Sequence, residues 1–424
     1  MRMTHESVSA RRHRPRTRRA PLRKSLSFLA IAGVGIVTAC GGSSSSGASS
    51  ASSNLTGAKL VIGVIASENG TGITQNSDIT TTAKNWQNYI NDHGGIAGHP
   101  VSVVVKQDGG NAATALQAAQ DLIQNDHAIA IGDASFAASG FQKYVDGANV
   151  PVISLLGATA SFLYVTDKNF FTNMTTIPAA AYAFAKTAQI AGGKSFGLLY
   201  CAEAATCAQS VPLFKADAKA VGLSFGYSAA VSASTPNYTA VCLAAKAAGV
   251  DALAIVGADQ QANLRIYDNC ATQGYKPIVL NGGSSLPQSS KTDPKIPVQW
   301  LFTPTLPTFV ESTATEPFRA AMGSYLATSA VPQNVMNAWV GLEVFAAAAK
   351  AGVTTGATPA ASAIYDGLYS LKAFTAGGLT GPLTYDRSKP SQSNCFFVSK
   401  IDHGVASTPN GTDPVCATGA AGQA

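Results

Sequence analysis

Short apolar runs alternate with helix-forming segments over a long stretch of the chain, from Leu60 to Asp133. The alternation comprises apolar runs at residues 60–65, 101–105 and 127–131 and helical segments at residues 80–91 and 112–125. Strands that are separated by helices must run parallel, because a crossover of that length carries the chain back to the same end of the sheet. The pattern therefore predicts an α/β fold with a parallel sheet and crossovers of one hand.

The same stretch carries an ordered set of residues at its turns. The first helix leads into Asn91–Gly98, which reads Asn-Asp-His-Gly-Gly-Ile-Ala-Gly, and the next strand is followed by Asp108. The pair Leu-Ile at 122–123 and then Gly132 complete the set. Together these pieces resemble the type I periplasmic-binding-protein family, and most of all the Leu/Ile/Val-binding proteins that feed ABC importers. The resemblance continues more loosely to about Val398.

The resemblance implies two doubly wound parallel-sheet lobes joined by a three-segment hinge, with crossings at residues 170–178, 294–307 and 374–381. The expected domains are a signal peptide at 1–39, a tether at 40–58, a first lobe at 59–177 and 308–375, a second lobe at 178–307 and 376–416, and a disordered tail at 417–424. Further helices are expected at 135–147, 179–192, 210–221, 238–248, 260–273, 315–325 and 335–351. Further strands are expected at 150–154, 195–200, 223–227, 252–256, 278–280 and 395–401.

The formal net charge of +6 is concentrated at the N-terminus. Residues 1–39 hold nine Lys or Arg residues and a single acidic residue, Glu6. The rest of the chain holds 20 basic and 22 acidic residues, so its net charge is near −2. A basic N-terminal region is typical of an export signal, and the charge of the remaining chain does not favour binding to nucleic acid.

The end of this N-terminal region predicts a lipid anchor. The apolar run at 26–37 is too short to span a membrane as a permanent helix. Val-Thr-Ala at 37–39 precedes Cys40, and two glycines follow it, which resembles a bacterial lipobox in which Cys40 is acylated. An ordinary signal peptide with an incidental cysteine is the alternative, and Arg18-Arg19 leaves both Sec and twin-arginine export open. Residues 41–58 are rich in Ser, Gly and Ala, a composition typical of a flexible tether.

Six cysteines remain once Cys40 is set aside. An even number fits an oxidising compartment outside the cytoplasm. Six cysteines allow fifteen pairings. Proximity in the sequence suggests the pairs Cys201–Cys207, Cys242–Cys270 and Cys395–Cys416. The spacing of these cysteines does not match a zinc site, so we expect no metal and no other cofactor.

Ligands of open α/β sheets bind beyond the carboxyl ends of the strands, where loops meet helix N-termini. This rule and the resemblance select three loops of the first lobe and two of the second. The candidate ligand-binding residues are Ser67, Glu68, Asn69, Gln75, Ser135, Phe136, Gly157, Ala158, Thr159, Asp259, Gly283 and Ser284. The resemblance implies that Ser135, Thr159 and neighbouring main-chain amides hold a ligand carboxylate. Local helix capping is the alternative role for both side chains.

The part of the site that would hold an ammonium group departs from the family pattern. The acidic residue that the resemblance implies for the second lobe falls near Asn281-Gly282-Gly283-Ser284, where the sequence has no carboxylate. Either Asp259 or Glu68 replaces that acid, or the ligand lacks an ammonium group. We favour the second interpretation.

The resulting hypothesis is a monomeric solute-binding protein that is lipid-anchored to the outer face of the bacterial cytoplasmic membrane. It would capture a small polar ligand, of the amino acid, amide or small carboxylate type, between its lobes and deliver it to an ABC permease. A ligand-sensing receptor module is the alternative. An anchored hydrolase is disfavoured because the sequence shows no coherent set of nucleophile, base and orienting residue.

Overall fold

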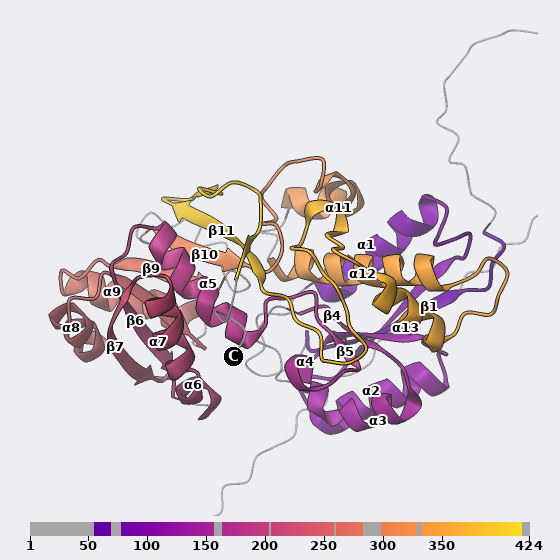
Figure 1. Ribbon diagram of the computed structural model, residues 1–424, viewed down its shortest axis with the longest axis horizontal. Helices are drawn as coiled ribbons and strands as arrows, with labels where there is room; N and C mark the ends of the chain where they lie inside the picture. Colours follow the sequence, from indigo (N-terminus) through magenta and orange to yellow (C-terminus); the bar gives the residue numbers. More distant parts are fainter. Residues whose placement is uncertain are drawn as a thin grey trace, which may run out of the picture. The chain divides into compact units, whose positions relative to one another are not determined.

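The computed structural model of the protein describes residues 55–68, 78–156, 163–202, 205–257, 260–282, 298–328 and 333–417. These residues form two α/β lobes, each organised around its own sheet (Figure 1). The first sheet has five strands and the second has eight. This architecture confirms the fold class that the sequence predicts.

The first sheet is wholly parallel and has the strand order β2-β1-β3-β4-β5. Its elements up to the first crossing are β1 (Leu60–Ala66), α1 (Ile79–Asp92), β2 (Val101–Gln107), α2 (Ala112–Gln124), β3 (Ala130–Ala134), η1 (Ala138–Gly140), α3 (Gln142–Ala148), β4 (Val152–Ser154), α4 (Leu163–Thr166) and β5 (Phe170–Phe171). The central strand β1 is apolar throughout and buried except at Val61. Such a continuous apolar run is what a strand covered by helices on both faces requires.

Helices cover both faces of the first sheet (Figure 1). On one face, α2 and α3 pack in a cluster that includes Leu122, Phe141 and Val145. The opposite face is covered by α1, α11 (Glu316–Thr328), α12 (Gln333–Gly352) and α13 (Ala361–Ser370). Trp86 of α1 and Trp339 of α12 are both fully buried there. The helices beyond residue 310 therefore return to the first lobe.

Helices α12 and α13 approach each other closely because glycines stand at their contact. A Cβ atom added at Gly367 would lie 1.9 Å from the carbonyl oxygen of Ala348, and one at Gly352 would lie 1.8 Å from that of Ala363. Only glycine permits this approach of one helix backbone to another. The sequence does not predict α13, since its ten residues are mostly weak helix formers and include a glycine.

The second sheet has the order β12-β11-β10-β9-β8-β6-β7, and β13 pairs with β11. Its strands are β6 (Ser195–Cys201), β7 (Ser224–Val231), β8 (Ala252–Val256), β9 (Ile278–Gly282), β10 (Gln299–Thr303), β11 (Cys395–Asp402), β12 (Val405–Ser407) and β13 (Val415–Cys416). Its helices are α5 (Ile177–Ile190), α6 (Ala205–Gln209), α7 (Val211–Ala220), α8 (Thr239–Ala247) and α9 (Gln260–Thr272). The strand β11 joins antiparallel to β10 after the chain returns from the first lobe.

Several segments differ from the sequence prediction, three of them near the predicted site or hinge. The strand expected at 127–131 runs instead from Ala130 to Ala134, because His127 has a φ of 56° and belongs to the turn after α2. Residues Gly132 and Asp133 therefore lie within β3. The helix expected from Ser135 starts only at Gln142, after the short 3-10 turn η1. The expected crossing at 294–307 contains β10, a buried strand whose flanking prolines in the sequence obscured it.

Three chain segments connect the lobes: between β5 and α5, between β10 and α11, and between α13 and β11. Buried polar groups join these segments to each other and to α12. The backbone amide of Thr172 donates to Ser391 Oγ at 2.7 Å, and the Tyr385 hydroxyl donates to the carbonyl of Thr172 at 3.0 Å. The Thr305 hydroxyl donates to Asn337 Oδ1 at 2.7 Å. Three crossings held by hydrogen bonds make a hinge of the kind that the sequence predicts.

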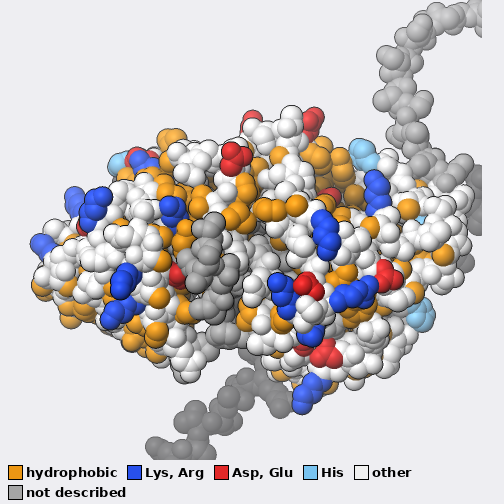
Figure 2. Space-filling model, viewed as in Figure 1, with side chains coloured by type: hydrophobic (Ala, Val, Ile, Leu, Met, Phe, Trp, Pro, Cys, Tyr) orange, Lys and Arg blue, Asp and Glu red, His pale blue; other side chains and the backbone are white. Residues whose placement is uncertain are grey.

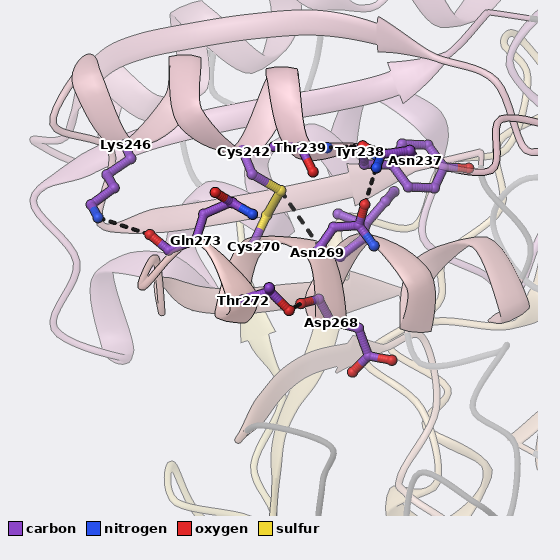
Figure 3. Close-up of a disulfide and its surroundings, with 11 residues drawn as sticks. Asn237, Tyr238, Thr239, Cys242, Lys246, Asp268, Asn269, Cys270, Thr272 and Gln273 are labelled. Atoms are coloured by element: carbon purple, nitrogen blue, oxygen red, sulfur yellow. Dashed lines mark hydrogen bonds between the residues drawn. A yellow bond between two sulfur atoms is a disulfide. The ribbon is translucent and has the colours of Figure 1, made fainter.

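The structure contains the three disulfides that proximity in the sequence suggested, and all three lie in the second lobe. Cys242–Cys270 joins α8 to α9, as Figure 3 shows. Beside it, the backbone amide of Tyr238 donates to Asn269 Oδ1 at 2.7 Å, so a hydrogen bond and a covalent bond fix the same helix pair. Cys395–Cys416 joins β11 to β13, and Cys201–Cys207 joins the end of β6 to α6.

On the face drawn in Figure 2, Lys and Arg side chains are interspersed with Asp and Glu side chains. This distribution agrees with the near-neutral balance of charges beyond residue 39. Among the residues that the structure describes, no helix combines the length and the apolar character needed to cross a membrane.

Candidate ligand-binding site

The carboxyl ends of the first lobe's strands meet at one edge of the sheet. In the parallel register, Ala66 at the end of β1 pairs with Gln107 of β2 and with Ala134 of β3, and Asp133 pairs with Ser154 of β4. The residues that follow these strands must therefore lie side by side. This edge brings Ser67 and Ser135 together, as the sequence analysis expects.

A buried carboxylate joins these loops. Asp108, which follows β2, is only 2% exposed. Its Oδ1 accepts a hydrogen bond from the Ser67 hydroxyl at 2.5 Å and one from the Gly110 amide at 2.8 Å. Its Oδ2 accepts a hydrogen bond from the Ser135 hydroxyl. Both serine side chains are fully buried, so their hydroxyl protons are committed to Asp108.

The amides of the loop after β3 are also bonded within the loop cluster. The Ser135 amide donates to Asp133 Oδ1 at 2.9 Å. The Phe136 amide donates to Ser67 Oγ at 3.0 Å, and the Ala137 amide donates to Ser135 Oγ at 2.8 Å. The resemblance implied that Ser135 and these amides grip a ligand carboxylate. In this structure these donors hold the loop in shape, and a ligand contact of Ser67 or Ser135 stays a prediction.

A second buried carboxyl group, that of Asp133, lies beneath the same loop. Burial raises the pKa of Asp133 to about 7, because a charged carboxylate is poorly solvated there. Hydrogen bonds from Tyr164 and from the Ser135 amide lower this pKa, whereas the nearby charge of Asp108 raises it. The Tyr164 hydroxyl donates to Asp133 Oδ2 at 2.7 Å. The base of the site is therefore a network of two carboxyl groups, two serines and a tyrosine.

The Phe136 side chain is the apolar group of this loop that faces solvent. It is 44% exposed, although large apolar side chains are usually buried. The backbone on both sides of it is fixed by the hydrogen bonds of Ser135 and Ala137 described above. The sequence analysis placed Phe136 in the site, and the structure places its ring on the surface of the loop.

Glu68 has a structural contact of its own. Its Oε1 accepts a hydrogen bond from the Thr80 amide at 2.9 Å, and its Oε2 accepts one from Gln107 Nε2 at 2.6 Å. A carboxylate beside the first turn of α1 is stabilised by the free amides of the helix start. Glu68 can meet a ligand ammonium group only while it also performs this capping role.

Several predicted site residues lie outside the described parts of the chain. They are Asn69, Gln75, Gly157, Ala158 and Thr159 of the first lobe and Asp259, Gly283 and Ser284 of the second. The predicted lipidation residue Cys40 also lies outside. Their roles stay predictions.

The second lobe presents its own strand ends. Asn281 at the end of β9 is 4% exposed and donates to Gln299 Oε1 at 3.0 Å. A neutral amide thus occupies the neighbourhood in which the resemblance placed an acid.

The loop after the neighbouring strand β8 packs against a disulfide. Gly257 has a φ of 78°, and a Cβ atom added there would lie 2.9 Å from the Cβ atom of Cys201. The Cys201–Cys207 disulfide therefore packs directly against the loop after β8.

The sequence analysis did not single out Asp133 or Tyr164, although Asp133 lies in one of the loops that it selected, and it noted Asp108 only as part of the family pattern. The signal for Asp108 was present, since an acidic residue directly follows a strand whose first five residues are mostly apolar. For Asp133 the misplaced bounds of β3 concealed its inward position. Tyr164 gave no signal, because its contact spans 31 residues of sequence.

Two grooves lie elsewhere on the first lobe. One, of about 570 Å3, runs between α1 and α11, and its lining includes Tyr89, His93 and Glu316. The other, of about 490 Å3, is lined partly by Asp146 and Tyr365. Neither is lined by a predicted site residue. Among the described residues, no group of three or more His, Cys, Asp or Glu side chains is placed to hold a metal ion.

The chain resembles several solved structures at low sequence identity. The branched-chain amino acid transporter substrate binding protein LivJ from Streptococcus pneumoniae, in complex with isoleucine, is 16% identical, with a TM-score of 0.67 over 85% of this chain and 100% of that chain. A solute binding protein of an ABC transporter from Rhodopseudomonas palustris HaA2, in complex with p-hydroxybenzoic acid, is 16% identical, with a TM-score of 0.66 over 85% and 98%.

A fatty acid ABC transporter substrate-binding protein from Thermomonospora curvata is 17% identical, with a TM-score of 0.64 over 82% of this chain and 90% of that chain. No functionally curated protein matches the sequence significantly. The family model described as periplasmic binding protein matches residues 59–407, which is most of the chain and spans both lobes. The chain therefore belongs to the periplasmic binding protein family, whose members are extracytoplasmic substrate-binding proteins of transporters rather than enzymes.

Proposed function

We propose that this protein is a lipid-anchored solute-binding protein that captures a small polar ligand and delivers it to an ABC importer. The observation that carries the proposal is the loop cluster at the carboxyl edge of the first sheet. There, buried hydrogen bonds fix the loop after β3 and present Phe136 to solvent. A rigid loop that exposes an aromatic ring at this edge is suited to holding a ligand.

The ligand site combines this loop with the predicted residues around it. Phe136 contacts the apolar part of the ligand from the first lobe. Around it, we assign ligand contacts to the predicted residues of the neighbouring loops, which are Glu68, Asn69, Gln75, Gly157, Ala158 and Thr159. From the second lobe we assign Asp259, Gly283 and Ser284. Ser67 and Ser135 act through the loop that they position.

Binding requires no chemical step in this proposal. A ligand that touches both lobes favours the closed arrangement by its differential affinity for that arrangement. The three hydrogen-bonded crossings supply the hinge about which the lobes move. A closed, ligand-loaded form is then the form that a permease recognises. The ligands named for the solved neighbours, isoleucine and p-hydroxybenzoic acid, support a small ligand with an apolar body.

The first test identifies the solute and locates its contact. Ligand extracted from protein purified from its own host is identified by mass spectrometry and titrated back into the emptied protein by calorimetry. Phe136→Ala should weaken binding about tenfold to a hundredfold, because the ligand no longer buries the ring. Leu243→Ala is the matched control, since Leu243 is 46% exposed on α8 of the second lobe. Equal affinity for the two variants would remove Phe136 from the site.

The membrane anchor is tested separately. Cys40→Ala should move the protein from the membrane fraction to the soluble fraction of its host, because the acylated residue is lost. A protein that stays in the membrane fraction after this change would refute the lipoprotein assignment.

Transport is tested in host cells that lack the protein. Uptake of the labelled solute should fall in these cells and recover when the wild-type gene is restored. Unchanged uptake, together with tight binding in solution, would favour the ligand-sensing receptor over the importer.

A further inference from the structure

We infer that the loop after β3 excludes a ligand carboxylate, and that the ligand meets this loop with an uncharged apolar or amide end. The inference rests on the proposed function and specifies the ligand class for the same site. It departs from the carboxylate grip that the resemblance to amino acid-binding proteins implied. Three observations carry it: the use of the loop's donors, the charge beneath the loop, and the group at its surface.

The hydrogen-bond donors of the loop are already engaged. The hydroxyl groups of Ser67 and Ser135 both donate to Asp108. The three successive amides from Ser135 to Ala137 donate to Asp133 Oδ1, Ser67 Oγ and Ser135 Oγ, at 2.8 to 3.0 Å. A carboxylate is held by donors, so binding it here would require breaking at least one of these bonds. Breaking one would leave a buried acceptor unsatisfied, which is unfavourable.

The charge beneath the loop also opposes an anion. Glu68, Asp108 and Asp133 stand at the ends of the three adjacent strands β1, β2 and β3. The described residues of these loops, 66–68, 107–111 and 133–137, include no Lys or Arg. The nearest basic residue before Asp108 in the sequence, Lys106, forms its ion pair with Asp126 at 3.2 Å. An incoming carboxylate would therefore meet carboxyl groups in a poorly solvated setting.

The exposed surface of the loop is an aromatic ring. The face of a phenyl ring carries partial negative charge, so it attracts positively polarised N–H groups and repels anions. The ring is also apolar, so it packs favourably against apolar groups. Phe136 stands at the centre of the hydrogen-bonded run from Ser135 to Ala137, so its backbone position is fixed. An apolar or amide end of a ligand can pack against this ring without bringing a negative charge near the buried carboxyl groups of Asp108 and Asp133.

The first arm of the test needs no ligand. Hydrogen exchange of the ligand-free protein, resolved to single amides, should show protection at Phe136 and Ala137, because both amides are bonded to buried serine oxygens. Rapid exchange at both positions would mean that the donors are free for an anion and would overturn the inference.

The second arm compares matched probes by titration calorimetry. The pairs are p-hydroxybenzoate with p-hydroxybenzamide, L-isoleucine with L-isoleucinamide, and octanoate with octanamide. In each pair that binds, the amide should bind about tenfold or more tightly than the carboxylate. Tighter binding of the carboxylate member would overturn the inference while leaving the solute-binding function intact. If no probe binds, the exchange measurement decides alone.

Two variants test the cause of this preference. Asp108→Asn removes a charge and an acceptor, and Ser67→Ala removes the oxygen that engages the Phe136 amide. Each should shift the carboxylate-to-amide affinity ratio toward the carboxylate by about tenfold, by independent routes. Asp268→Asn is the control, because Asp268 is exposed on α9 of the second lobe (Figure 3). An unchanged ratio in a folded Ser67→Ala protein, as judged by circular dichroism, would contradict the mechanism.

Discussion

The two lobes share an architecture but are stabilised by different means. The first lobe buries Trp86, Trp339 and Phe345 in its core, and the hydrogen-bonded network around Asp108 joins the loops at the carboxyl edge of its sheet. The second lobe has three disulfides, which join β6 to α6, α8 to α9, and β11 to β13. The sequence from 59 to 177 and from 308 to 375 contains no cysteine at all. Protonation should therefore act mainly on the first lobe, and redox state on the second.

The comparison also bears on the two walls of the proposed site. In the first lobe, the loop after β3 is fixed by five internal hydrogen bonds, including two to buried Asp108. In the second lobe, the Cys201–Cys207 disulfide packs against Gly257, close to the predicted contact Asp259 in the sequence. One wall is thus held by polar contacts and the other by a covalent bond. Conditions that disturb one wall should leave the other in place.

The largest expected effect comes from removing all three disulfides. Each should contribute on the order of 2–4 kcal/mol to the free energy of unfolding, mainly by restricting the unfolded chain. Replacement of the six cysteines by serine should lower hydrogen-exchange protection in β8, α8 and α9, while β1 and β3 keep theirs. Equal loss of protection in both lobes would show that they unfold as one cooperative unit and would break the comparison.

The next effect is a pH dependence that belongs to the first lobe. Below about pH 4, Asp133 is protonated in the folded and the unfolded protein alike. Between about pH 4 and 7 the unfolded chain loses this proton while the folded protein keeps it, so the contribution of Asp133 to stability falls as pH rises. Asp133→Asn removes this penalty, since Asn does not ionise.

The stability of Asp133→Asn should therefore rise relative to wild type by up to about 4 kcal/mol between pH 4 and pH 8. Urea unfolding of both proteins at the two pH values measures this difference. The comparison at pH 4 is the control, because it records the effect of the substitution without ionisation. A constant difference across this range would show that Asp133 does not titrate near neutrality.

A smaller effect tests the close packing of α12 and α13 in the first lobe. Gly367→Ala should lower the free energy of unfolding by about 1–3 kcal/mol, because the added Cβ would meet the Ala348 carbonyl oxygen. Gly147→Ala in α3 is the matched control, since an added Cβ there has no neighbour within 4 Å. That control should raise the free energy of unfolding by about 0.5–1 kcal/mol. Thermal unfolding of both variants compares the two signs directly.

Much of the fold could be predicted from the sequence where the pattern is local. The apolar run of β1 and the strand β8 were predicted within a residue, because each is bounded by clear turn signals. The strand β10 was missed because prolines flank it, and its place in the sheet depends on pairing with β9 and β11. Such pairings join segments far apart in the sequence, so no local pattern reveals them.

The position of the candidate loops at the sheet edge was predictable, but their hydrogen bonds were not. Ser67, Ser135 and Phe136 were placed at the correct edge by the rule for strand ends. Their hydrogen bonds were not predicted, because Ser67 and Ser135 reach Asp108 across 41 and 27 residues of sequence. In the structure, these hydroxyl groups and the amides of residues 135–137 donate within the loop cluster, and whether the loop also binds a ligand stays a prediction. Long-range polar contacts of this kind become visible only in the folded protein.

The most direct test of the central claim is hydrogen exchange of the protein with and without its co-purified ligand. The claim is that the ligand binds at the carboxyl edge of the first sheet and engages the second lobe across the hinge. Ligand should increase protection at residues 133–137 of the first lobe and at residues 256–257 and 281–282 of the second. Protection confined to the groove between α1 and α11, with residues 133–137 unchanged, would contradict it.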